Sequence, residues 1–254
     1  MDKVKVIGVI AIIAGVITAG FVMGDFLPAI GDINSAPNGY LSVYYITNAL
    51  HDTEAPNMVT AVLADYRGFD TLFETCVMFL AGVTTLMVLS SKRKVVKGKR
   101  NEHDLNGVSF GGTVLDTGFR IIIPVIVIYA FYVLSHGEIS LGGGFQAGAL
   151  LAIAYMIDRL IPSFQNSLGN FTEEAAAIIA GLGVFIYAFT GVLPMFNGGY
   201  FLEYDHLPFA FMVEEIVMLH SVGIFMIEAG VTVCVMGTII NILEVVLERT
   251  EFDD

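Results

Sequence analysis

The stretch SHGEISLGGGFQAGALLAIAYMID, residues 135–158, joins three consecutive glycines, Gly142, Gly143 and Gly144, to an almost wholly apolar segment. Glycine costs stability inside a helix, but it allows sharp turns and lets another backbone approach closely. Irregular backbone at membrane depth persists only where it is buried in protein or faces water. The stretch therefore predicts a chain that turns back into a membrane through a glycine turn packed tightly against other protein.

The composition supports a membrane location. Of the 254 residues, 56% are hydrophobic and 15% are charged, and the mean hydropathy is +0.75, whereas soluble domains carry about 25% charged residues. The net charge of −13 does not suggest nucleic-acid binding, which needs basic patches. Cys76 and Cys234 lie in apolar runs without a CxxC pair, so we interpret both as buried small side chains.

The apolar runs predict an all-α integral membrane protein with six transmembrane helices, because a helix of about 20 apolar residues crosses a bilayer. The predicted spans are residues 6–21, 71–90, 117–134, 144–161, 174–193 and 215–243. Lysine and arginine in short loops mark the cytoplasmic side. With six spans and a cytoplasmic N-terminus, all of the 12 basic residues except Arg67 fall on the inner side. We therefore expect cytoplasmic termini and a multi-pass protein of the cell (plasma) membrane.

Two acids near the outer end of the second span are candidates for ion translocation. Asp70 and Glu74 are four residues apart, so on a helix they share a face. Together they could bind a hard cation such as sodium, or pass protons. The alternative is a solvated helix end at which Arg67 neutralises Asp70. Residues 59–64, just before them, are too short to cross a bilayer and form either a re-entrant or interfacial piece or an early start of the span.

Ionisable groups in the sixth span are candidates of the same kind, because charge at membrane depth is costly. Glu228 is the deepest acid of the chain, and His220 lies two turns earlier. A histidine titrates near neutral pH and burial favours the neutral form of a carboxyl group, so the pair suits a proton relay. The alternative is a protonated Glu228 hydrogen-bonded to a neighbouring helix. His136, at the rim of the glycine turn, is a pH-responsive candidate or an ordinary interfacial histidine.

Catalytic motifs are missing from the sequence. It has no P-loop, no GxGxxG in a strand–helix setting, no nucleophile elbow and no cysteine or histidine cluster for zinc or iron–sulfur. We therefore expect no metal site and no cofactor in this chain, and no enzyme activity of the chain by itself. Many glycines fall within the spans, and small residues mark close helix packing in lipid. The chain is expected to pack against more helices than its own.

Two motifs carry a resemblance to a known family. VTAVLADYRGFDTLFE, residues 59–74, resembles the C-terminal end of the large subunit of Mrp-type multisubunit cation/proton antiporters and the small E-type subunit of archaeal membrane-bound hydrogenases. HGEISLGGGFQAGALLA, residues 136–152, resembles MnhB/MrpB-type subunits, the F-type subunit of the same complexes, with Leu141 where proline is common. The order resembles a fusion of a two-span unit, residues 1–95, and a four-span unit, residues 96–254, across a basic linker.

The resemblance implies a membrane subunit of a large complex that couples a redox module, or a proton gradient, to cation movement, usually sodium against protons. It implies that Asp70 and Glu74 lie near an ion path and that the subunit carries no metal cluster. It also implies three kinds of partner: other Mrp-type membrane subunits, a cytoplasmic-side redox module with iron–sulfur clusters, and lipid. Hydrogenases, sulfane-sulfur reductases and stand-alone antiporters share such subunits, and the fusion favours an archaeal respiratory complex.

Three functional hypotheses follow. The first is a subunit that contributes to sodium/proton translocation only together with partner chains. The second is a non-conducting scaffold subunit of the same complex. The third, a self-sufficient secondary transporter, is disfavoured because the sequence lacks paired broken helices in matching halves.

Overall fold

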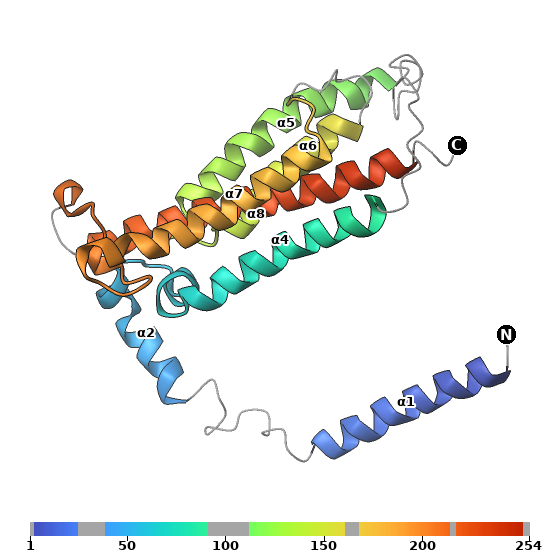
Figure 1. The fold of residues 1–254 in the computed structure, drawn as a ribbon, viewed down its shortest axis with the longest axis horizontal. Helices are drawn as coiled ribbons and strands as arrows, with labels where there is room; N and C mark the ends of the chain where they lie inside the picture. Colours follow the sequence, from blue (N-terminus) through green and yellow to red (C-terminus); the bar gives the residue numbers. More distant parts are fainter. Residues whose placement is uncertain (1–2, 25–38, 91–111, 161–167, 214–216, 251–254) are drawn as a thin grey trace. The chain divides into compact units, whose positions relative to one another are not determined.

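The computed structural model describes residues 3–24, 39–90, 112–160, 168–213 and 217–250, and these parts are built from helices and connecting turns (Figure 1). The long helices are α1 (Lys3–Gly24), α2 (Tyr40–Thr53), α4 (Gly68–Ser90), α5 (Gly112–Ser135), α6 (Gly144–Leu160), α7 (Glu173–Val192) and α8 (Met218–Thr250). The short elements are α3 (Met58–Thr60), a π-helix η2 (Ala61–Tyr66), and the 3₁₀ helices η3 (Leu193–Asn197), η4 (Tyr204–His206) and η5 (Ala210–Met212).

Four of the described helices are long and apolar enough to cross a membrane: Gly68–Leu89, Thr117–Ser135, Glu173–Asn197 and Met218–Leu247. They correspond to the second, third, fifth and sixth predicted spans, which are confirmed, so the chain is a multi-pass membrane protein. The first predicted span coincides with α1, whose apolar part is the shorter Ala11–Gly24, and the fourth coincides with α6, which has 17 residues. The count of six spans and the cytoplasmic termini stay predictions.

The chain divides into two compact units, Met1–Thr47 and Asn48–Asp254. The first unit contains α1 and the beginning of α2. The second contains every residue proposed above as functional. The predicted boundary between residues 95 and 96, and the basic linker around it, lie outside the described residues. Residues 48–90 pack in the same unit as residues 112–250.

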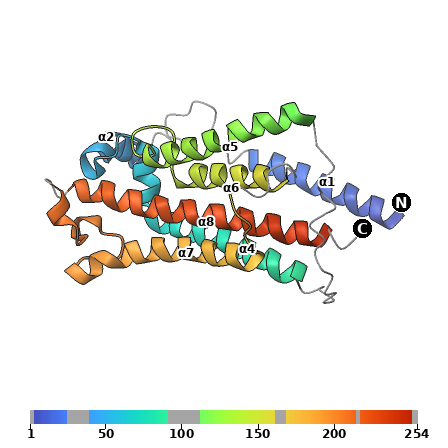
Figure 2. The same ribbon diagram turned by 90° about the horizontal axis from the view of Figure 1, so that it is seen from above.

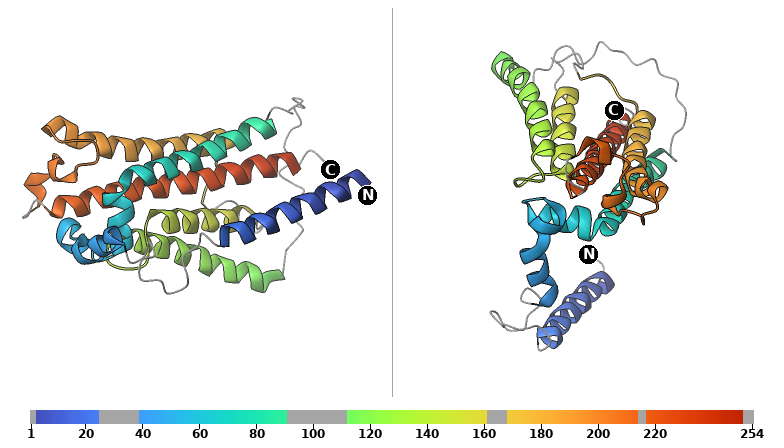
Figure 3. Two further views of the ribbon diagram at one scale, coloured as in Figure 1. Left: turned by 90° about the horizontal axis from the view of Figure 1, so that it is seen from below. Right: turned by 90° about the vertical axis from the view of Figure 1, so that its left-hand side faces the viewer.

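Helix α8 lies among α4, α6 and α7, as the perpendicular views show (Figure 2 and Figure 3). Glycines bring the backbones together: a methyl group added at Gly183 of α7 would lie 2.5 Å from the carbonyl oxygen of Gly230 in α8. One added at Gly237 would lie 2.5 Å from the backbone nitrogen of Ala180. Because any larger side chain would separate α7 from α8, these glycines explain why α8 is the buried centre of the unit.

The chain enters α4 through the π-helix η2, which decides between the two readings of residues 59–64. The η2 helix ends at Tyr66, and the N–H of the next residue, Arg67, donates to the carbonyl of Val62 at 2.8 Å. A π-helical turn leaves carbonyl groups unused, and hydroxyl groups fill this need. Thr71 donates to the carbonyl of Leu63 at 2.7 Å, and Tyr204 donates to that of Ala64 at 2.9 Å. The segment is therefore a separate short helix, not an early start of the span.

The two cysteines are both free. Cys234 is fully buried, as predicted, but Cys76 is only half-buried. The prediction for Cys76 is wrong because α4 turns much of its surface away from the other helices of the unit, so an apolar run there does not mean burial within this chain.

Candidate functional site

The centre of the candidate site is the carboxyl group of Glu228, which rests on the backbone of the glycine turn. We call Gly137, Gly142, Gly143 and Gly144 the glycine corner. A methyl group added at Gly137 would lie 2.6 Å from Oε2 of Glu228, and one added at Gly143 would lie 2.9 Å from Oε1. Gly143 has a φ of +129°, a conformation that favours glycine. The corner is therefore shaped to receive this carboxyl group, and no residue with a Cβ would fit at Gly137 without displacing it.

Helix α6 is fixed against the same part of α8. Gly144 lies directly against the carbonyl of Glu228, and a methyl group added at Gly148 would lie 2.7 Å from the carbonyl oxygen of Thr232. The Thr232 hydroxyl donates to the carbonyl of Glu228 at 2.8 Å and lies 3.2 Å from that of Gly144. The contact is as close as two helix backbones allow, so the position of Glu228 is set by backbone and not by adaptable side chains.

Glu228 is 8% exposed, and its Oε2 has no hydrogen-bond partner among the described residues. A second carboxyl group, that of Glu138, is close enough to act on it electrostatically. Burial raises the pKa of Glu138, and a hydrogen bond to Ser221 partly opposes this. A buried polar atom without a partner is costly, so the pair suits a site at which a proton or a cation arrives from elsewhere.

The segment before the π-helix holds the glycine corner in place. The Asn57 side chain donates to the carbonyls of Gly137 and Ser140 at 2.9 and 2.8 Å, and its backbone N–H donates to the carbonyl of Glu138 at 2.8 Å. The Thr60 hydroxyl donates to the same Gly137 carbonyl at 2.7 Å. Sequence reasoning missed this role of Asn57 and Thr60, since no local signal reports contacts between segments so far apart in the chain.

His220 connects three elements at the N-terminal end of α8. Its Nδ1 pairs with Asp65 of the π-helix, and its Nε2 lies 2.9 Å from Oδ1 of Asp205 in η4. The side chains of His220 and Asp65 are 15% and 14% exposed, whereas that of Asp205 is 48% exposed. A carboxylate accepts at each nitrogen, and only the doubly protonated ring donates from both. The arrangement therefore fits an imidazolium that lies between an exposed acid, Asp205, and a half-buried acid, Asp65.

Buried Tyr204 holds this arrangement together. Its ring meets that of His220 edge-on, with centroids 5.8 Å apart, and a methyl group added at Gly223 would run into it. Burial raises the pKa of Tyr204 well above its ordinary value, with smaller contributions from Tyr187 and Asp65. Tyr204 is therefore a neutral hydrogen-bond donor that anchors η4 on α8.

His136 is placed differently from the other candidates. Its ring stacks on that of Tyr132 with centroids 4.0 Å apart, and its Nδ1 lies 3.1 Å both from the Tyr132 carbonyl oxygen and from the hydroxyl of Ser135. These contacts fold it back on the end of α5. The structure brings its neighbours Gly137 and Glu138 to Glu228, but not the His136 ring.

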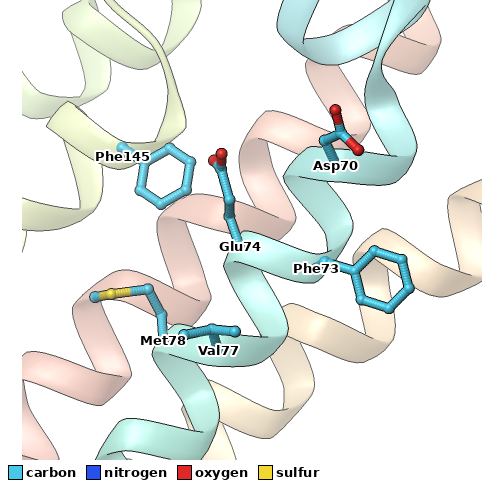
Figure 4. A pocket seen from close by; sticks show the side chains of 6 residues that line it. All are labelled: Asp70, Phe73, Glu74, Val77, Met78 and Phe145. Atoms are coloured by element: carbon cyan, nitrogen blue, oxygen red, sulfur yellow. The ribbon is translucent and has the colours of Figure 1, made fainter. Parts of the chain in front are cut away.

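Asp70 and Glu74 line an open pocket of about 480 Å³ between α4 and the start of α6 (Figure 4). Phe73, Val77, Met78 and Phe145 complete its lining. Both acids are exposed. Asp70 pairs with Arg67, whose Nε donates to it at 2.7 Å, as the solvated-end alternative predicts. Glu74 lies beside Phe145 in Figure 4, and no hydrogen bond or ion pair between described residues joins Asp70 or Glu74 to Glu228.

A polar cluster at the other end of α8 was missed by sequence reasoning. Glu244 is buried, and it accepts hydrogen bonds from Tyr155 at 2.7 Å and from Nε of Arg159 at 2.9 Å. Nearby, the Asn241 amide donates to the carbonyl of Glu173 at 2.7 Å. Glu244 stands just past the predicted end of the sixth span, so its burial was not evident. Glu244, with both of its oxygens bonded, ties α8 to α6, and the Asn241 amide ties α8 to α7, although its Oδ1 has no partner among the described residues.

Metal ligands do not gather in the described part of the chain. It contains no group of three or more histidine, cysteine, aspartate or glutamate side chains that could hold a metal ion.

Comparison with known proteins supplies the family. Residues 114–241 match the domain related to the MnhB subunit of Na⁺/H⁺ antiporters. The chain belongs to the MnhB family. Residues 8–98 match a second family, MbhE, which is the E-type subunit of MBH. An MnhB-family chain that also carries an MbhE-like part is what the two sequence motifs predicted.

Solved structures and relatives agree with this assignment. A chain of the membrane-bound sulfane sulfur reductase, an archaeal respiratory membrane complex, is 26% identical with a TM-score of 0.69, over 95% of this chain and 98% of that one. A chain of the Mrp complex from Dietzia sp. DQ12-45-1b shares the fold, with 24% identity and a TM-score of 0.63 over 94% of this chain and 26% of that one. The MnhB-family chain is thus of a type found in Mrp and archaeal respiratory complexes.

Among curated relatives, a probable K⁺/H⁺ antiporter A/B subunit of Rhizobium meliloti is 25% identical over 77% of this chain. The chain spans 59% and 22% of the lengths of the first two curated relatives that it matches.

Proposed function

We propose that this MnhB-family subunit contributes to sodium/proton translocation in a multisubunit complex of the plasma membrane, and that Glu228 is its internal ion-binding group. One observation carries the proposal: a carboxyl group that is 8% exposed has an oxygen without a partner among the described residues. Polar groups inside a membrane protein are costly and mark ion pathways. A merely structural acid would be expected to be fully bonded, as Glu244 is with Tyr155 and Arg159.

The route toward Glu228 begins at His220. Asp205 is exposed and meets one ring nitrogen, and the less exposed Asp65 meets the other. A proton taken up at the surface could therefore pass through the imidazole ring to the interior. Glu228 is eight residues further along α8, about 12 Å along the helix axis at 1.5 Å per residue. This gap is too long for a direct transfer, so water and Glu138 with Ser221 would complete the path.

Partner subunits of the complex would supply the functions that this chain does not perform by itself. The relatives' names include an antiporter subunit and a sulfane sulfur reductase, and we propose that this chain works with other Mrp-type membrane subunits and a redox module with iron–sulfur clusters. The chain itself would hold no cofactor and perform no redox step. His136 would act only indirectly, because its ring folds back on α5.

Transport by the intact complex in inverted membrane vesicles tests the proposal. Glu228→Gln keeps the size of the side chain and removes its charge and its titration. We expect the complex to assemble in wild-type amount while sodium/proton exchange falls by at least about a hundredfold, the lower end of the effect of a positioned proton-transfer group. Glu174→Gln is the matched control, because Glu174 is an exposed acid in the first turn of α7; its exchange should be unchanged.

The outcome separates translocation from a scaffold role. Full exchange by an assembled Glu228→Gln complex would contradict the proposal and leave the chain as a scaffold. Robust exchange by the isolated wild-type polypeptide in liposomes would contradict the requirement for partner chains.

A further inference from the structure

Helices α4 and α6 form an outward-facing surface that carries an acidic side chain, Glu74. At its depth in the span, contact of a carboxylate with lipid would be unfavourable. Glu74 is the seventh residue of α4, which begins at Gly68, so it lies about 9 Å along the helix axis from the start of the span at 1.5 Å per residue. Its side chain is exposed and lines the open pocket. A carboxylate at such depth that faces hydrocarbon costs several kcal/mol, so lipid alone is a poor neighbour for this surface.

The described part of the chain does not neutralise Glu74. No lysine, arginine or histidine among the described residues forms an ion pair with it. The nearest basic residue in the sequence, Arg67, is committed to Asp70 through both Nε and Nη2, and Arg159 is committed to Glu244. The overall charge of −13 makes the chain poor in cations generally. A positive charge from another chain would therefore complete this surface.

The rest of the surface has the form of a helix-packing face. Phe73, Val77 and Leu80 are 59%, 64% and 61% exposed, and their spacing of four and three residues places them on one stripe of α4. Phe145 of α6 forms the opposite wall of the pocket (Figure 4). Within a membrane, a partner that lies along such a stripe must itself be helical, because only helices and closed barrels satisfy their backbone there.

We propose that the groove between α4 and α6 is the docking surface for a transmembrane helix of a different membrane subunit, and that this helix carries a lysine or arginine that pairs with Glu74. A second copy of this chain does not fit, because a two-fold contact at this face would bring two Glu74 carboxylates together. The inference rests on the chain's membership of a membrane complex and is independent of any transport role for Glu228.

Photo-crosslinking in the intact complex tests the surface. A benzoylphenylalanine at Val77, on the stripe, should form an adduct with a second membrane subunit. The same amino acid at Phe185, 62% exposed on α7, sets the background for an apolar helix face of similar exposure. Adducts at position 77 with lipid only, or with another copy of this chain, would overturn the proposal.

Charge variants test the pairing. Glu74→Lys should lower the amount of partner subunit that copurifies with this chain by at least about tenfold, the effect of a like charge at a desolvated pair. Glu74→Gln should lower it less, and Glu74→Asp, which keeps the charge, should stay within about twofold of wild type. Copurification of Glu74→Lys at the wild-type level would overturn the basic partner. Exchange per assembled complex, measured in parallel, reports separately on Glu228.

Discussion

Glu228 and Glu74 both stand inside apolar spans of this chain, and the fold treats them in opposite ways. Glu228 of α8 is 8% exposed and lies on the backbone of the glycine corner, whereas Glu74 of α4 is exposed and lines an open pocket. The difference comes from the neighbours. Glycines let α6 and the turn before it close over Glu228, while the groove beside Glu74 is open and lined by larger side chains such as Phe73 and Phe145.

One chain can thus hold two acids at membrane depth for two purposes. A carboxyl group enclosed by its own chain and left with an unbonded oxygen is suited to receive a transported ion. A carboxyl group on an open face is suited to recognise another chain.

The largest expected effect is on stability, at Gly144. In Gly144→Ala the added methyl group meets the Glu228 backbone and lies 2.9 Å from Cβ of Val231. Because these atoms cannot move without separating α6 from α8, we expect a loss of about 1–3 kcal/mol in the free energy of unfolding. The melting temperature of the purified complex measures it. In Gly118→Ala, the control, the methyl group meets no atom within 4 Å, and an equal loss there would contradict the account.

The next-largest effect is expected on the position of the Glu228 carboxyl group, without loss of the fold. In Gly137→Ala the new methyl group lies 2.6 Å from Oε2 of Glu228 and 3.0 Å from Cα of Gly143. The carboxyl group is the end of a flexible side chain, so it should give way while the fold survives. We expect an assembled complex whose exchange rate falls severalfold. Normal exchange by this variant would mean that the position of the carboxyl group does not matter.

A moderate effect is expected at the aqueous end of α8. In Asp205→Asn one of the two carboxylates that meet His220 becomes neutral, while Asp65 remains. One ring nitrogen then meets an amide in place of a carboxylate, so the pH dependence of exchange should differ from that of the wild type. The pH profile of exchange measures this difference. His206→Asn, a change in the same short helix, is the control, and an identical profile for Asp205→Asn and wild type would argue against His220 as a proton carrier.

The smallest effect concerns Glu138. In the folded protein, burial raises the pKa of Glu138 above its ordinary value of 4.5. Folding therefore favours the neutral carboxyl group. The contribution of this group to stability is complete below pH 4.5 and is lost as pH rises through the raised pKa. Glu138→Gln stays neutral and can still bond Ser221. The melting temperature of Glu138→Gln should therefore rise relative to that of the wild type as pH rises above 4.5. A difference that is constant with pH would contradict the assignment.

Much of the fold could be predicted because the apolar runs are long. The four confirmed spans and the depth of Glu228 follow directly from the pattern of hydrophobic and charged residues. The glycines indicated close backbone contact, but not that the contact would be with Glu228, since a packing partner cannot be read from one helix alone.

The meeting of His220 with Asp65 and Asp205 could not be predicted. It depends on the π-helix, which rotates Asp65 relative to an α-helix, and on a 3₁₀ turn that Tyr204 anchors on Gly223. Likewise the bonding of Glu244 to Tyr155 and Arg159 requires α6 and α8 to be packed first. Local sequence signals describe single elements, whereas these contacts join elements far apart in the chain.

The most direct test measures two quantities for two variants of the intact complex: the amount assembled and the sodium/proton exchange per assembled complex. If Glu228 binds the transported ion and Glu74 binds a partner subunit, Glu228→Gln assembles normally and exchanges at about a hundredth of the wild-type rate or less, the scale expected for a lost proton-transfer group. Under the same assignment, Glu74→Gln assembles in a smaller amount than the wild type, with normal exchange by the complexes that form. The reverse pattern, with exchange lost at Glu74 and kept at Glu228, would contradict it.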